Sequence, residues 1–307
     1  MSSSPDSQDQ SAAADSTALP DAPAIDELRR TAVLLATTAA DLARVRRREV
    51  GVGAGRAEGT EVKSSRVDPV TVVDTETEAH VRRLVAALRP GDAVFGEEEG
   101  DGDGSGATCS GVRWIVDPID GTVNFLYGIP AYAVSVACEV DGAIVAGAVA
   151  DIAGGRVFHA GLGAGAEVHA ADGTAETLTC SAPADLGVSL VATGFAYDSA
   201  RRSRQGRVVA ELLGEVRDIR RIGSAALDLC LLAAGAVDCY YEHGLSLWDW
   251  AAGALIAREA GAVVKHPDPA TGSPEGQLMA AAAPTVAEDF LGLLGRLGAD
   301  GPIPAGE

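Results

Sequence analysis

Several acidic residues of this chain stand at the ends of apolar segments, where a solvated surface charge is unusual. Glu97 comes shortly after an apolar pair, at the expected end of a strand, and Asp117 and Asp120 follow the apolar run 112–116. Asp249 stands at the start of an apolar helical segment. One such residue alone is more typical of a turn or a helix cap. Because several occur together, we predict a shared site at which these carboxylates meet.

The chemistry that such a site favours is that of a hard divalent cation. Mg²⁺ binds one or two carboxylates together with water and phosphate oxygens. Carboxylates at several strand ends can also build the two-metal site of many phosphatases. Bound cations would make an acidic site accept an anionic substrate. The Gly121-Thr122 pair is expected to open a helix, whose backbone N–H groups would hold a phosphate. The sequence therefore predicts magnesium-dependent phosphate chemistry.

Two stretches of the chain resemble the signatures of the inositol monophosphatase family. The first is residues 117–125 (DPIDGTVNF), where the family has Asp-Pro-Ile/Leu-Asp-Gly-Thr with Asn-Phe close behind. The second is residues 248–253 (WDWAAG), followed by 259–262 (EAGA). Other family-like segments, in the family's order, are residues 63–74, 96–98 and 223–226. The resemblance extends over roughly residues 25–295, and such a combination of motifs is highly specific.

The resemblance implies a role for individual residues. The implied magnesium ligands are Glu97, Asp117, the carbonyl of Ile119, Asp120 and Asp249. Asp74 is implied to contact a further, weaker metal and to bond Thr122. In the family mechanism a metal-activated water attacks phosphorus, with Glu97 or the Thr122 and Asp74 pair orienting and deprotonating it. The implied substrate contacts are Asp120, Gly121, Thr122, Gly223, Ser224, Ala225, Glu242 and Asp249.

The substrate implied by the resemblance is a small phosphorylated polyol. Asn124-Phe125 and Glu242 favour inositol 1-phosphate, which would be hydrolysed to inositol and phosphate. Histidinol phosphate, fructose 1,6-bisphosphate and adenosine 3′,5′-bisphosphate remain alternatives within the family. A further alternative is a non-catalytic regulatory binding protein, against which the intact set of ligands argues.

Hydrophobic patterning predicts the elements that position these residues. Apolar residues recur at helical spacing over residues 25–42: Ile25, Leu28, Ala32, Leu35, Ala39 and Leu42. We expect a strand over residues 70–73, and a helix opened by a capping box of Thr75 and Glu78, so that Asp74 lies at the junction. Asp141-Gly142 predicts a hairpin between strands at residues 132–139 and 143–150. Helices are expected at residues 225–234 and 250–260.

The implied fold is α/β, a layered α/β/α/β/α sandwich of the sugar-phosphatase type. We expect a disordered acidic tail over residues 1–24, an α+β portion over 25–160 that binds metal and phosphate, and an α/β portion over 161–300 that completes the site. Residues 301–307 are expected to be a loose end. Loops are expected at residues 51–59 and 100–111, which are rich in glycine.

Composition excludes some classes of partner. A net charge of −20 argues against binding of nucleic acid or an anionic membrane, both of which need clustered Lys and Arg. The five cysteines form no close pair, and no apolar run is long enough to span a bilayer. We therefore expect a cytoplasmic protein. The family resemblance further implies a homodimer.

Overall fold

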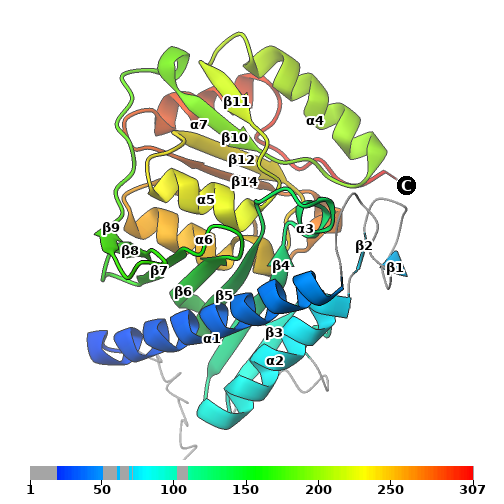
Figure 1. Cartoon of the computed structure of the whole chain (residues 1–307). Helices are drawn as coiled ribbons and strands as arrows, with labels where there is room; N and C mark the ends of the chain where they lie inside the picture. Colours follow the sequence, from blue (N-terminus) through cyan, green and yellow to red (C-terminus); the bar gives the residue numbers. More distant parts are fainter. Residues whose placement is uncertain (1–18, 51–60, 63–68, 71, 102–109, 307) are drawn as a thin grey trace, which may run out of the picture.

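The computed structural model describes residues 19–50, 61–62, 69–70, 72–101 and 110–306, and the elements lie in five layers (Figure 1). Two helices, α1 (Ala22–Glu49) and α2 (Val72–Leu88), cover one face of a seven-stranded sheet. On the other face lie α5 (Ala225–Ala233) and α6 (Leu247–Glu259). A five-stranded sheet follows, and α4 (Ser199–Leu212) and α7 (Ala287–Arg296) pack on its outer face. The predicted α/β/α/β/α sandwich is thereby confirmed.

The seven-stranded sheet begins with one parallel pair and continues as an antiparallel meander. Its strands, in spatial order, are β3 (Ala93–Gly96), β4 (Val112–Asp120), β5 (Ala133–Val140), β6 (Ala143–Asp151), β7 (Val157–Gly161), β8 (Ala166–His169) and β9 (Ala175–Thr177). The predicted hairpin joins β5 and β6. Asp141 and Gly142 have φ angles of 50° and 82°, which the Asp-Gly pair tolerates in a two-residue hairpin turn.

The five-stranded sheet is mixed. Its order is β11 (Asp218–Arg220), β10 (Leu190–Thr193), β12 (Cys239–His243), β14 (Leu278–Ala282) and β13 (Val263–Lys265). The remaining elements are the short pair β1 (Glu61–Val62) and β2 (Pro69–Val70), the helix α3 (Thr122–Tyr127), and the 3₁₀ turns Leu186–Val188 and Ser273–Glu275. No helix among the described residues is both long and apolar enough to cross a bilayer.

Besides the apolar layer under α4 and α7, two further apolar layers join the sheets and helices into one molecule. One lies between α1, α2 and the seven-stranded sheet and includes Leu35 and Trp114, both fully buried. The other fills the space between the two sheets around α5 and α6, with Leu229 and Leu255 fully buried. Since α5 and α6 are apolar on most sides, their sequences show little amphipathic periodicity and are typical of helices buried between sheets.

Several boundaries differ from the expectations. The strand expected over residues 70–73 ends at Val70, and α2 begins at Val72, so that Asp74 lies in its first turn. The loose end expected after residue 300 is docked: Ile303 is buried, and its N–H donates to the Gly276 carbonyl at 2.8 Å. The loop at residues 51–59, most of the loop at 100–111 and residues 1–18 of the tail lie outside the described residues.

Helix α1 begins three residues before the predicted boundary at residue 25. Asp21 is its N-cap, and its Oδ1 accepts a hydrogen bond from the Ala24 N–H at 3.0 Å. Deleting residues 1–18 is expected to leave the free energy of unfolding unchanged, whereas Asp21→Ala lowers it by about 1 kcal/mol because an N-cap is lost. Urea titrations of both variants measure this. Equal destabilisation by the two changes would contradict the assignment of Asp21 as the boundary.

Candidate active site

Glu97 lies beside the end of β4 because β3 and β4 run parallel. Gly96 is in register with Val116, and the N–H of Glu97 donates to the Val116 carbonyl at 3.2 Å. The next residue of β4 is Asp117, and the strand continues to Asp120. The carboxyl ends of parallel strands meet at one edge of a sheet. The structure therefore brings together two of the three acidic groups predicted from the sequence.

Glu78 holds the turn that carries Glu97, a role that the sequence did not reveal. Its carboxylate accepts hydrogen bonds from the N–H groups of Glu98 and Glu99 at 2.8 and 3.1 Å. Arg82 donates to the same carboxylate at 2.8 Å. The predicted capping box assigned Glu78 to the start of α2, but Glu78 instead reaches residues 20 positions away. A Cβ at Gly96 would lie 2.3 Å from the Glu78 carboxylate carbon, so a larger residue there would displace the Glu78 side chain.

Asp120 connects the seven-stranded sheet to α5. Its Oδ2 accepts hydrogen bonds from the Ser224 hydroxyl at 2.6 Å and from the Ala226 N–H at 2.7 Å. These donors lie at the N-terminus of α5, where unpaired N–H groups and the helix dipole favour a negative charge. Asp117 accepts from the N–H of Ile119 at 3.0 Å, and the register with β5 shifts between Asp117 and Asp120.

Asp249 lies in the first turn of α6 and reaches the other carboxylates from the helix layer between the two sheets. Its Oδ2 accepts a hydrogen bond from the Ser246 N–H at 2.6 Å, which completes a capping box. The preceding residue, Trp248, is tied to the seven-stranded sheet because Ser135 on β5 donates to its carbonyl at 3.2 Å. Phe95 packs on the Trp248 ring at 5.3 Å between centroids. The start of α6 is thus fixed against β3 and β5.

Burial raises the pKa of three carboxyl groups of this site, and two of them are raised further by neighbouring carboxylates. Burial is the largest cause that raises the pKa of Asp117 well above 3.8, and further increases come from Glu97, Asp120, Asp249 and Asp74. Burial raises the pKa of Asp120 to about 6, although its hydrogen bonds from Ser224 and Ala226 act in the opposite direction. Burial and the charges of Asp120 and Glu97 raise the pKa of Asp249. Buried carboxylates that repel one another offer oxygen ligands to a hard cation, so the donor set fits Mg²⁺.

The two polar residues predicted beside these ligands lie close by. Asp74 is buried in the first turn of α2, and its charge contributes to the raised pKa of Asp117. The Thr122 hydroxyl donates to the Ile119 carbonyl at 3.0 Å, the carbonyl that the family resemblance assigns to a metal. The predicted bond between Asp74 and Thr122 stays a prediction.

A cavity of about 240 Å³ opens above the carboxylates. It is lined by seven predicted site residues, namely Glu97, Asp120, Gly121, Gly223, Ala225, Glu242 and Asp249. The predicted residues Asp74, Asp117, Ile119, Thr122 and Ser224 do not line it. Ser224 is buried, and its hydroxyl donates to Asp120.

Arg221 also lines the cavity and was missed in the sequence. Its positive charge lowers the pKa of Asp120 and of Glu242. Among the described residues that line the cavity it supplies the one Lys or Arg side chain, so it can attract an anionic ligand. Its place just before the Gly223-Ser224 segment was the available signal.

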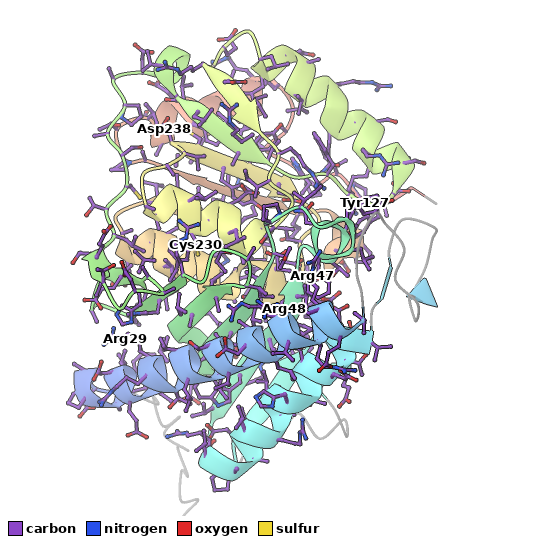
Figure 2. The ribbon with its side chains drawn as sticks, in the orientation of Figure 1. Arg29, Arg47, Arg48, Tyr127, Cys230 and Asp238 are labelled. Atoms are coloured by element: carbon purple, nitrogen blue, oxygen red, sulfur yellow. The ribbon has the colours of Figure 1, made fainter. Side chains whose placement is uncertain are left out.

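Asn124 ties the segment after α3 to the segment before α5 and does not line the cavity. Its amide donates to the carbonyls of Ala131 and Ile222, both at 2.8 Å. Arg47, labelled in Figure 2, reaches from α1 and donates to the Phe125 carbonyl at 3.1 Å. Asn124 and Phe125 therefore hold α3 in place. This structural role accounts for their position just after the Asp-Gly-Thr element.

Comparison with known proteins decides the family. Residues 24–295 match the sequence profile described as the inositol monophosphatase family. The chain belongs to this family. It therefore belongs to a family of phosphoric monoester hydrolases, as the sequence predicted.

Two relatives are similar over about nine tenths of the chain, and a third over a shorter part. An inositol-1-monophosphatase of Mycobacterium leprae is 53% identical over 284 residues, which are 91% of this chain and 97% of the relative. The solved structure of Mycobacterium tuberculosis SuhB is 46% identical, with a TM-score of 0.76, and the match covers 90% of this chain and 98% of that chain. The Nus factor SuhB of Vibrio cholerae is 40% identical over 198 residues, or 64% of this chain and 71% of that protein.

Proposed function

We propose that this enzyme is a magnesium-dependent phosphatase that hydrolyses inositol 1-phosphate to inositol and phosphate. The observation that supports it most is the meeting of Glu97, Asp117, Asp120 and Asp249, from different elements, beside one cavity. The two relatives with mycobacterial names, one of them called an inositol-1-monophosphatase, support the substrate. The match to a Nus factor has lower sequence identity and covers less of the chain, so it gives the regulatory alternative less support.

The residues have distinct roles in this proposal. Glu97, Asp117, the Ile119 carbonyl, Asp120 and Asp249 would hold Mg²⁺, with Asp74 near a weaker position. Bound Mg²⁺ would supply positive charge for the phosphate and lower the pKa of a water molecule. Glu97, or Thr122 with Asp74, orients the attacking water and takes its proton. The N–H groups of Gly121 and Thr122 hold phosphate oxygens.

Gly223, Ala225 and Glu242 are proposed to contact the polyol, since all three line the cavity. Ser224 would act through Asp120, to which its hydroxyl donates. The homodimer and the cytoplasmic location expected from the sequence remain predictions.

The experiment that tests the substrate is a phosphate-release panel at saturating Mg²⁺. It compares inositol 1-phosphate with histidinol phosphate, fructose 1,6-bisphosphate and adenosine 3′,5′-bisphosphate. The proposal predicts the highest kcat/KM on inositol 1-phosphate. A higher value on any of the other three would reassign the substrate, and no release from any of them would favour the regulatory alternative.

Glu242 is the residue expected to select the polyol. It lines the cavity, its Oε2 accepts a hydrogen bond from the Tyr240 hydroxyl at 2.9 Å, and burial raises its pKa to about 7. Glu242→Gln keeps one acceptor and removes the charge. We expect kcat/KM on inositol 1-phosphate to fall roughly 10- to 150-fold. This corresponds to a loss of about 1.5–3 kcal/mol in transition-state stabilisation, as for a hydrogen bond to a charged group.

The control for this variant is a substrate that lacks the polyol. On an aryl phosphate the loss should be smaller, because no hydroxyl is there to bind Glu242. Glu176→Gln, on the exposed strand β9, should leave kcat/KM unchanged on both substrates. Equal losses on both substrates with Glu242→Gln would show that Glu242 acts only through local structure.

A further inference from the structure

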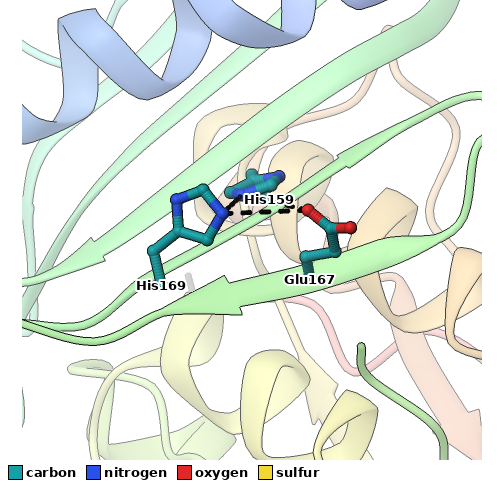
Figure 3. Close-up of side chains that lie close together, drawn as sticks. All are labelled: His159, Glu167 and His169. Carbon is teal, nitrogen blue, oxygen red and sulfur yellow. Dashed lines mark hydrogen bonds and ion pairs between the residues drawn. The ribbon is translucent and has the colours of Figure 1, made fainter. Parts of the chain in front are cut away.

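A second group of potential metal ligands lies on β7 and β8, away from the carboxylate cavity. His159 stands directly opposite Glu167 across the antiparallel pair, and His169 is two residues further along β8. Residues two apart on a strand share a face, so all three side chains project from the same face of the sheet. Figure 3 shows both rings and the Glu167 carboxylate turned toward one another. None of the three lines the carboxylate cavity.

The distances within this trio suit a small metal ion. The Nε2 atoms of His159 and His169 lie 3.2 Å apart. The nearer Glu167 oxygen is 3.7 Å from His169 Nε2 and 4.0 Å from His159 Nε2. Two nitrogens that bind one tetrahedral zinc ion at 2.0–2.1 Å would be about 3.3–3.4 Å apart. The two imidazoles thus already have this spacing, and within the trio the half-exposed Glu167 has to move inward by roughly half an ångström.

We propose that His159, Glu167 and His169 form a binding site for a divalent transition-metal ion of the zinc class, separate from the magnesium site. Two imidazoles and one carboxylate are ligands that Zn²⁺ and Co²⁺ prefer, whereas Mg²⁺ prefers oxygen alone. A water molecule would complete the tetrahedron, because Glu167 and His169 are each about half exposed. The metal would crosslink β7 and β8. These strands lie toward the β9 edge of the seven-stranded sheet, at the opposite side from β3 and β4.

The surroundings of His159 keep its ring available as a ligand. The side chain is buried, and burial together with the charges of His169 and Arg29 lowers its pKa to about 4. The ring is therefore neutral at pH 7, as a metal ligand must be. His169 lies at the surface and gives an ion access from solvent.

Arg29 on α1 competes with a metal for this site. Its Nη1 lies 3.1 Å from His159 Nδ1 and 3.5 Å from the Glu167 carboxylate. A neutral histidine that binds metal through Nε2 carries its proton on Nδ1, where it cannot accept from Arg29. Metal binding therefore requires Arg29 to leave His159, while its Nε and Nη2 can keep their bonds to Asp26 Oδ1 at 3.2 and 2.6 Å. Without a metal, the same residues form a hydrogen-bonded network.

The two possibilities, a metal site or a hydrogen-bonded network alone, predict different effects of Arg29→Met on the affinity for metal. If the trio binds metal, Arg29→Met removes a competing positive charge and tightens binding. If the trio is only a hydrogen-bonded network, the same change creates no affinity for metal. Methionine keeps most of the aliphatic length of arginine, so packing against the sheet changes little.

The test is a calorimetric titration of Zn²⁺ into the full, untagged chain in excess Mg²⁺, which competes with Zn²⁺ for the carboxylate site. We expect one Zn²⁺ per chain. His169→Ala and Glu167→Gln should each weaken its binding at least about tenfold, and Arg29→Met should tighten it. His266→Ala removes an exposed histidine outside the trio and should change nothing.

Co²⁺ provides a second measurement on the same proteins. Tetrahedral coordination by two imidazoles should give visible absorption that is absent in His169→Ala, while the all-oxygen carboxylate site remains in both proteins. The proposal would be overturned if wild-type protein binds no Zn²⁺ in excess Mg²⁺, or if His169→Ala binds Zn²⁺ and Co²⁺ as wild type does. Because His169 is half exposed, its replacement should not impair folding.

Discussion

Asp120→Asn is expected to lower kcat/KM on inositol 1-phosphate about 1000-fold, or about 4 kcal/mol. Asparagine has the same size and keeps an oxygen that can accept from the Ser224 hydroxyl and the Ala226 N–H, the two bonds that Asp120 now makes. It lacks the negative charge that a Mg²⁺ ligand supplies. The loss should therefore appear in turnover rather than in folding. Phosphate release at saturating Mg²⁺ measures it, and activity above a tenth of the wild-type value would show that Asp120 is not a central ligand.

Unfolding in chelator is the control for this variant. Burial raises the pKa of folded Asp120 from 3.8 to about 6, so ionised Asp120 destabilises the metal-free protein. This penalty grows as the pH rises from 3.8 through 6 and is fully present at pH 8. Metal-free Asp120→Asn should then be at least as stable as wild type at pH 8. At pH 4 the advantage should be smaller, and a large loss of stability at pH 8 would mean that the variant fails by unfolding.

Gly121→Ala is expected to lower the free energy of unfolding by about 2–5 kcal/mol. Gly121 has a φ of 95°, where an L-residue is strained by about 1–2 kcal/mol. A Cβ there would also lie 2.9 Å from the Ala131 carbonyl oxygen and 3.1 Å from that of Gly223. Such overpacking costs about 1–3 kcal/mol. Because Gly121 lies between Asp120 and Thr122, turnover should fall as well.

Gly173→Ala separates strain from overpacking. Gly173 has a similar φ of 86°, but a Cβ there would meet no atom within 4 Å. Its replacement should cost only the backbone strain, about 1–2 kcal/mol, and leave kcat/KM unchanged. Urea titrations of the two variants measure the difference. If both lose the same stability, the close approach of Gly121 to its neighbours contributes nothing.

The positions of the acidic groups could be predicted from local sequence. An apolar run followed by Asp or Glu predicted a shared site for Glu97, Asp117 and Asp120, although β4 does not end at residue 116 but continues to Asp120. Asp141-Gly142 likewise marked a hairpin, because few residue pairs accept two positive φ angles. In each case the signal lies within a few residues of the feature that it predicts.

Contacts between distant segments could not be predicted in this way. Glu78 resembled a capping residue, yet its partners are the N–H groups of Glu98 and Glu99. Ser224 is predicted to contact substrate, and the sequence did not reveal that its hydroxyl donates to Asp120, 104 residues away. These roles depend on how β3, α2 and α5 pack, which no short window of sequence records.

The docked C-terminus was missed for a similar reason. The segment after residue 300 contains proline and glycine without periodicity, which is typical of a loose end. Its order comes from a partner elsewhere in the chain: the Ile303 N–H donates to Gly276, and the Ala305 N–H donates to Pro274. The histidine pair of β7 and β8 also became visible only with the register of those strands.

The central claim is that the carboxylate site binds Mg²⁺ and that inositol phosphate hydrolysis depends on it. The most direct test is phosphate release from inositol 1-phosphate by the wild-type chain, freed of metal by a chelator and then titrated with Mg²⁺. The account predicts that activity is lost in excess chelator and returns with Mg²⁺ to its full value. Full turnover in excess chelator would contradict it.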